Sequence, residues 1–107
     1  LRNEQLVAMR KYADALPRPL IVAGDLNASV WSPHFKDFVR GLNLVDPRRG
    51  RGLFNTFPAS SRFGPLTPID HVLVSPELEV IGLSLHPIVD SDHVGLLAEI
   101  SALPQPE

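Results

Sequence analysis

The chain has 107 residues, which is the size of one domain. Its apolar fraction of 44% is sufficient for a hydrophobic core, and its net charge of −2 lacks the basic excess of non-specific nucleic-acid binders. The absence of cysteine excludes disulfides and thiolate metal sites. No apolar run reaches the ~18 residues that a membrane-spanning helix needs.

The first half of the chain predicts helix, strand and helix. Apolar residues recur at helical spacing over residues 3–15, before Pro17. Residues 20–23 are a short, continuous apolar run, which predicts a strand buried on both faces. Ser32 followed by Pro33 is typical of a helix N-cap and first turn. The apolar stripe of this helix consists of Phe35, Phe38, Val39 and Leu42. The helix is predicted to end at Gly41 or Asn43.

The second half predicts a loop and three strands. Residues 46–68 are rich in proline, glycine and polar residues without a period, which indicates a long loop. Strands are predicted over residues 69–75, 78–85 and 94–100, and residues 102–107 are expected to be a disordered tail. This order predicts an α/β (α+β) fold, with a mixed β-sheet and two helices on one face.

The first candidate site lies directly after the first strand. If the chain stays extended there, Asp25 and Asn27 project from the same face, at a strand end where open α/β sheets often place their sites. The alternative is a turn in which both side chains cap backbone groups.

Two further candidates lie beside the later strands. Asp70 opens an otherwise apolar strand, where a charged group needs a partner. If the strands are neighbours, both Asp70 and Asp92 can reach His93. One carboxylate would fix the imidazole tautomer and raise its basicity, and the other could hold a hard divalent cation. The alternative is a simple salt bridge at a strand end.

Other site chemistries have weaker support. A Ser91-centred hydrolase triad lacks the Gly-x-Ser-x-Gly elbow, and immediate neighbours rarely face one another. The four histidines lack the paired spacing of a zinc site, whereas oxygen-rich groups favour Mg²⁺ or Mn²⁺. The basic run of residues 48–51 is either a solvated loop or a phosphate-facing one.

Three motifs occur in one order: Gly24-Asp25-Leu26-Asn27 after a strand, Ile69-Asp70-His71 opening a strand, and Ser91-Asp92-His93 before the last strand. This combination resembles the endonuclease/exonuclease/phosphatase superfamily, which has the deoxyribonuclease-I-like fold. Residues 2–5 are similar to its Arg-x-x-Gln at the head of a helix, and residues 55–58 to its Thr-aromatic-Pro loop.

The resemblance implies a role for each site residue. Asp25 would orient or deprotonate the attacking water, and Asn27 would hold the nucleophile or a phosphoryl oxygen. Asp70 would orient His93, whose imidazole would stabilise charge on the phosphoryl group. Asp92 would take part in binding Mg²⁺ or Mn²⁺.

The resemblance also implies a substrate side of the site, formed by Arg48, Arg49, Arg51, Thr56 and Phe57. Two positions depart from the family pattern. Pro68 replaces a residue that is often basic, and Gly95 replaces a usual proline. Both departures leave the catalytic residue types intact.

The chain begins with Leu1 instead of Met, and it lacks a counterpart of the family's amino-terminal half. That half supplies an Asn, the principal metal-binding Glu and another His. We therefore expect residues 1–107 to be the carboxy-terminal half of a four-layer sandwich. The metal would need ligands from the absent half, and the uncovered sheet face would favour a homo-oligomer.

The preferred hypothesis is the carboxy-terminal part of a metal-dependent phosphoesterase that hydrolyses phosphodiester or phosphomonoester bonds by attack of water. The isolated chain is expected to have little or no activity. One alternative is a catalytically degenerate member that acts as a protein-interaction module. Another is a nucleic-acid-binding domain, which the net charge does not support. Neither the substrate nor the compartment follows from the sequence.

Overall fold

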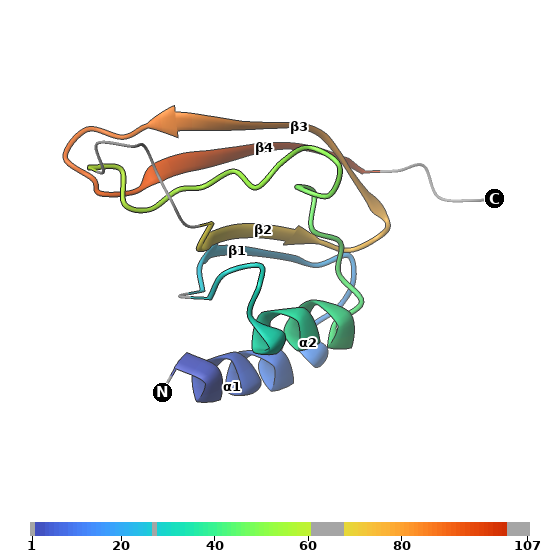
Figure 1. Ribbon diagram of the computed structural model, residues 1–107. Coiled ribbons are helices and arrows are strands. Elements are labelled where there is room, and N and C mark those ends of the chain that lie inside the picture. Colours follow the sequence, from blue (N-terminus) through green and yellow to red (C-terminus); the bar gives the residue numbers. More distant parts are fainter. Residues whose placement is uncertain (1, 27, 61–67, 103–107) are drawn as a thin grey trace.

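The computed structural model describes residues 2–26, 28–60 and 68–102, which form three tiers (Figure 1). Two helices form the first tier, two paired strands the second, and a β-hairpin the third. The elements in chain order are α1 (Arg2–Asp14), β1 (Ile21–Asp25), α2 (Pro33–Gly41), β2 (Asp70–Val74), β3 (Leu78–Pro87) and β4 (Val94–Ala102). Within the described residues, neither helix is long and apolar enough to cross a membrane.

The α+β class and the order of elements are confirmed, but the expected single mixed sheet is corrected. The described strands form two separate antiparallel pairs, β1 with β2 and β3 with β4. Strand β4 pairs with β3 along its whole length, so the backbone groups on that edge of β4 form their hydrogen bonds with β3. Strand β4 contacts β2 without joining its sheet.

The prediction of a first strand buried on both faces was wrong. In β1 only Val22 is half-buried, and it packs against the helical core. Its neighbours Ile21 and Ala23 project from the opposite face and are exposed, because both helices lie on one side of the β1–β2 pair.

The second helix begins as its sequence predicts. Ser32 has extended backbone angles, and its hydroxyl accepts a hydrogen bond from Phe35 N at 3.4 Å. Pro33 occupies the first turn, where its missing N–H leaves no partner unsatisfied. The helix gives way to Asn43, whose φ of 51° is left-handed and stops further helical turns.

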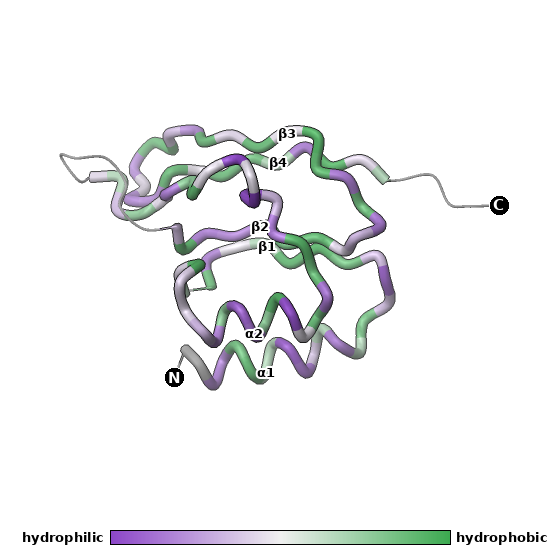
Figure 2. The backbone as a smooth tube through the Cα atoms, turned by 45° about the vertical axis from the view of Figure 1, so that its right-hand side comes forward, coloured by the Kyte–Doolittle hydropathy of each residue, from purple (hydrophilic) through white to green (hydrophobic). Residues whose placement is uncertain are grey.

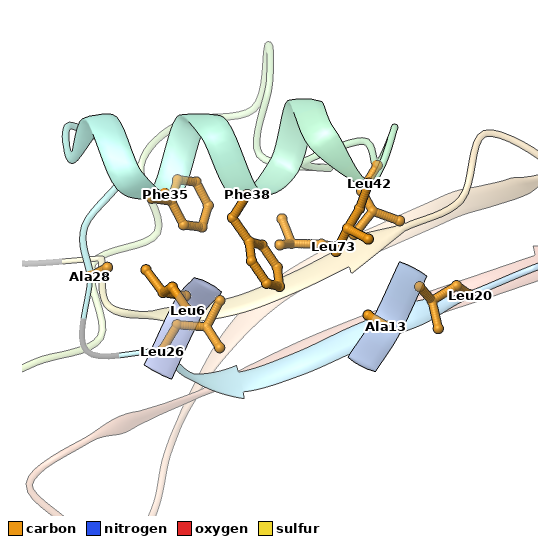
Figure 3. Packing of buried hydrophobic residues seen from close by; sticks show 10 residues of the cluster. Leu6, Ala13, Leu20, Leu26, Ala28, Phe35, Phe38, Leu42 and Leu73 are labelled. Carbon is orange, nitrogen blue, oxygen red and sulfur yellow. The ribbon is translucent and has the colours of Figure 1, made fainter. Parts of the chain in front are cut away.

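The core lies between the helices and the β1–β2 pair (Figure 3). Its residues are Leu6, Ala13, Leu20, Leu26, Ala28, Phe35, Phe38, Leu42, Leu44 and Leu73. Figure 2 shows apolar segments along β1 and β2, which lie between the helices and the hairpin. This packing holds the ends of β1 and β2 in place, and these ends form the candidate site.

Candidate active site

Two carboxylates meet at one end of the β1–β2 pair. Asp25 is the last residue of β1 and lies directly opposite Asp70, the first residue of β2. Directly opposed residues in antiparallel strands project from the same face, and two like charges there repel each other. The pair therefore requires a cation or proton donor close by.

The imidazole of His93 lies between the two carboxylates. His93 Nδ1 is 2.6 Å from Asp70 Oδ2, and His93 Nε2 is 3.8 Å from Asp25 Oδ2. The three side chains are partly exposed, at 30% for His93, 34% for Asp25 and 20% for Asp70. The site is thus a carboxylate–imidazole–carboxylate arrangement that remains open to solvent.

The surroundings of His93 favour its protonated form. The hydrogen bond that His93 Nδ1–H donates to Asp70 raises the pKa of His93 above its usual value of 6.5, against a lowering by desolvation. The negative charges of Asp70, Asp25 and Asp92 also raise this pKa. Phe57 covers part of the imidazole, with 4.9 Å between ring centroids and a 44° tilt.

Hydrogen bonds connect segments that are distant in the sequence around this cluster. Thr56 is fully buried; its hydroxyl accepts from Asp70 N at 3.3 Å, and its carbonyl accepts from Val94 N at 2.8 Å. Asp92 Oδ1 accepts from Ser60 N at 3.1 Å, and hydrogen bonds with Ser60 lower the pKa of Asp92. The loop that contains Phe57 is therefore bonded on both sides of the Asp70–His93 pair.

A hollow of about 190 Å³ adjoins the cluster, between the β1–β2 pair and β4. Asp70 and His93 line this hollow together with apolar residues that include Val72, Ile88 and Leu96. The hollow is therefore mostly apolar, and the imidazole is one of its few ionisable groups.

Comparison with known proteins agrees with the motif order. Residues 6–93, which are most of the chain, match the sequence profile described as the Endonuclease/Exonuclease/phosphatase family. The chain belongs to the endonuclease/exonuclease/phosphatase family. Proteins of this family are in general hydrolases.

A solved structure supports the family fold. It is described as the crystal structure of an endonuclease/exonuclease/phosphatase from Beutenbergia cavernae DSM 12333. The two chains are 23% identical and superpose with a TM-score of 0.61, over 95% of this chain and 31% of that one. This chain therefore spans about a third of that structure. The search of curated proteins found no match.

The described residues of the three family motifs meet at one place. Asp25, Asp70 and His93 lie together, Phe57 lies against the imidazole, and the Thr56 hydroxyl accepts a hydrogen bond from Asp70 N. Asn27 lies outside the described residues. Asp92 adjoins His93 in the chain, and its carboxylate is bonded to the Ser60 amide. The structure thus places one residue from each of the three motifs at one strand end.

Two of the three arginines in residues 48–51 lie away from the candidate site. Arg49 and Arg51 line a larger hollow of about 460 Å³ near Val74, at the opposite end of β2 from Asp70. Arg48 was expected on the substrate side, but its side chain is only 4% exposed and forms hydrogen bonds inside the protein. Burial therefore keeps this arginine away from solvent.

Sequence reasoning missed the role of His71 and Asp46. His71 is 1% exposed, lies between Arg48 and Ala28, and stacks on Phe35 with 4.3 Å between ring centroids. The available signal was strand alternation: His71 shares a register face with the core residue Leu73, so a buried and hydrogen-bonded imidazole could have been predicted.

The site offers ligand atoms of the type that a metal requires. One ligand atom each from Asp25, Asp70 and His93 lies within 4.8 Å of the others. Carboxylate oxygens suit hard divalent cations such as Mg²⁺, which keeps several waters when few protein ligands are present. Asp25 and Asp70 thus offer carboxylate oxygens and His93 offers an imidazole nitrogen, and of these atoms Asp70 Oδ2 is already bonded to His93 Nδ1.

Proposed function

We propose that the chain is the carboxy-terminal part of a metal-dependent phosphoesterase, which hydrolyses phosphodiester or phosphomonoester bonds by attack of water. The supporting observation is the position of His93 between Asp25 and Asp70, at 3.8 Å and 2.6 Å. An imidazole whose protonated form is favoured by its neighbours and a carboxylate, at one open strand end, suit an anionic substrate and a water nucleophile.

The three side chains would divide the chemistry. Asp25 would orient the attacking water and accept its proton as the new P–O bond forms. The bond to the leaving oxygen would break with its electron pair on that oxygen. His93 would direct Nε2–H at a phosphoryl oxygen, because Nδ1 is occupied by Asp70. Asp70 would thereby keep the imidazole oriented and cationic.

A divalent cation would take an oxygen ligand from Asp25, which belongs to the Asp25–Asp70–His93 group. Further ligands would come from Asp92, whose carboxylate is not among the ligand atoms of that group, and from outside the 107 residues. When bound, Mg²⁺ or Mn²⁺ supplies positive charge that stabilises the phosphoryl oxygens. Since few carboxylates are available here, we expect the isolated chain to bind the metal weakly and to have little or no activity.

The test is metal-dependent hydrolysis of bis(p-nitrophenyl) phosphate and p-nitrophenyl phosphate. It compares the 107-residue chain with a longer form, in which the amino-terminal half of an endonuclease/exonuclease/phosphatase domain precedes these residues. We expect activity with Mg²⁺ or Mn²⁺ in the longer form, and loss of activity on chelation.

Variants of the longer form test the roles. Asp25→Asn and His93→Gln should each lower kcat by about 10²–10⁴-fold, the range of general acid–base and charge-stabilising groups. Asp14→Asn, on the exposed end of α1, removes a carboxylate outside the site and should leave kcat unchanged. Equal activity in all three variants would refute the site, and no activity in the longer form would favour a protein-interaction module.

A further inference from the structure

A buried polar network lies beneath the Asp25–Asp70 end of the sheet. Arg48 donates from Nε to Asp46 Oδ1 at 3.0 Å and from Nη2 to Asp46 Oδ2 at 2.8 Å. Arg48 Nη2 also contacts His71 Nδ1, and His71 Nε2 is 2.5 Å from the carbonyl oxygen of Ala28. Both central side chains are almost fully excluded from solvent.

The network connects both segments that place the site carboxylates. Ala28 follows Asp25 by three residues, in the segment that leaves β1. Arg48 Nη1 also donates to the carbonyl oxygen of Asp70 at 3.3 Å. One arginine–histidine pair is therefore bonded both to the Asp70 carbonyl and to the Ala28 carbonyl, three residues after Asp25.

His71 fits this position as a neutral imidazole. A neutral ring has one donor and one acceptor, which match the Ala28 carbonyl and the Arg48 guanidinium. Burial lowers the pKa of His71 to about 4, which agrees with a neutral ring. The ring also stacks on Phe35, so its plane and both nitrogens are held at once.

We propose that His71 is a positioning residue for the candidate site. It holds the segment after Asp25 through Ala28 and holds Asp70 through Arg48, so that both carboxylates keep their places beside His93. Its effect on catalysis rests on the hydrolysis proposed above. Its effect on the backbone can be measured without any activity.

Four variants of the 107-residue chain separate positioning from stability. His71→Phe keeps a ring against Phe35 but removes one acceptor of the buried guanidinium, His71 Nδ1, and the contact with the Ala28 carbonyl. His71→Gln keeps an N–H donor and a carbonyl acceptor. The triple variant Asp46→Asn/Arg48→Met/His71→Phe removes both charges of the Arg48–Asp46 pair as well, which should recover stability. His86→Gln changes an exposed histidine of β3 and is the matched control.

Hydrogen exchange followed by NMR is the measurement. Leu26 N and Ser32 N donate to Ile69 O and Ser29 O, so these two amides report on the segment that Ala28 tethers. Val74 N, bonded to Val45 O at the far end of β2, reports on the rest of the sheet.

We expect His71→Phe to accelerate exchange at Leu26 and Ser32 at least tenfold more than at Val74. The acceleration should persist in the triple variant despite its recovered stability, and it should be smaller in His71→Gln. Equal acceleration at all three amides, or slow exchange restored in the triple variant, would overturn the proposal.

The outcome is independent of the proposed function. If the longer form hydrolyses phosphoesters, His71→Phe should lower its kcat more than it changes KM, and His71→Gln should recover part of the loss. An unchanged kcat in an active form would overturn positioning. No hydrolysis by any form would refute the proposed function, while the exchange result would still decide whether His71 holds the segment.

Discussion

Acidification should destabilise the protein through His71. The folded protein keeps this imidazole neutral because burial lowers its pKa from 6.5 to about 4, whereas the unfolded chain binds a proton near pH 6.5. Between these two values the unfolded state holds more protons than the folded state. The free energy of unfolding must therefore fall as the pH decreases from about 6.5 to about 4.

The magnitude follows from the two pKa values. Each unit of difference corresponds to 1.36 kcal/mol, so the shift from 6.5 to about 4 gives a loss of about 3 kcal/mol. His93 affects the free energy of unfolding in a higher pH range and in the opposite direction. Its raised pKa contributes stability that is complete below pH 6.5 and is lost as the pH rises through the folded-state value.

Urea unfolding followed by circular dichroism from pH 4.5 to 7.5 measures this dependence. The variant His71→Gln has no titrating group at this position. The slope of unfolding free energy against pH is compared between this variant and the wild type, so that the contributions of the other ionisable groups cancel. We expect the wild type to lose up to about 1.4 kcal/mol more per pH unit in this window. Equal slopes would refute the reasoning, as would an NMR titration in which the His71 ring protonates near pH 6.5.

The remaining predictions concern the site, the core and association. Asp70→Asn removes the main cause of the raised pKa of His93, so NMR titration should show this pKa falling towards 6.5; an unchanged value would contradict the hydrogen bond. Leu73→Ala, at a fully buried position, should cost about 2–5 kcal/mol of unfolding free energy, whereas Leu97→Ala, at a position 52% exposed, should cost less than about 1 kcal/mol. We also propose that the isolated chain self-associates through exposed apolar side chains of its strands, and a monomer at micromolar concentration in sedimentation would exclude this.

Much of the local structure was predictable because it depends on neighbouring residues. Ser32 and Pro33 specify the start of α2, since the cap and the missing N–H act within one turn. The three later strands follow from short apolar runs between turn residues. The burial of β1 was mispredicted, because a continuous apolar run does not reveal that helices cover only one of its faces.

The site was predictable in its residue types but not in its geometry. The order of the three motifs indicated that Asp25, Asp70 and His93 belong together. The distances depend on the β1–β2 register and on how β4 approaches β2, which no single segment determines.

The amino-acid sequence by itself determined the elements, the family and the acidic and imidazole groups available for chemistry. Only the tertiary structure decided that Arg48 turns inward to Asp46 and His71, although its neighbours Arg49 and Arg51 line a hollow at the other end of β2. The reason is physical. Adjacent arginines are equivalent as local sequence, and a guanidinium is buried only where the folded chain supplies a carboxylate and hydrogen-bond acceptors around it.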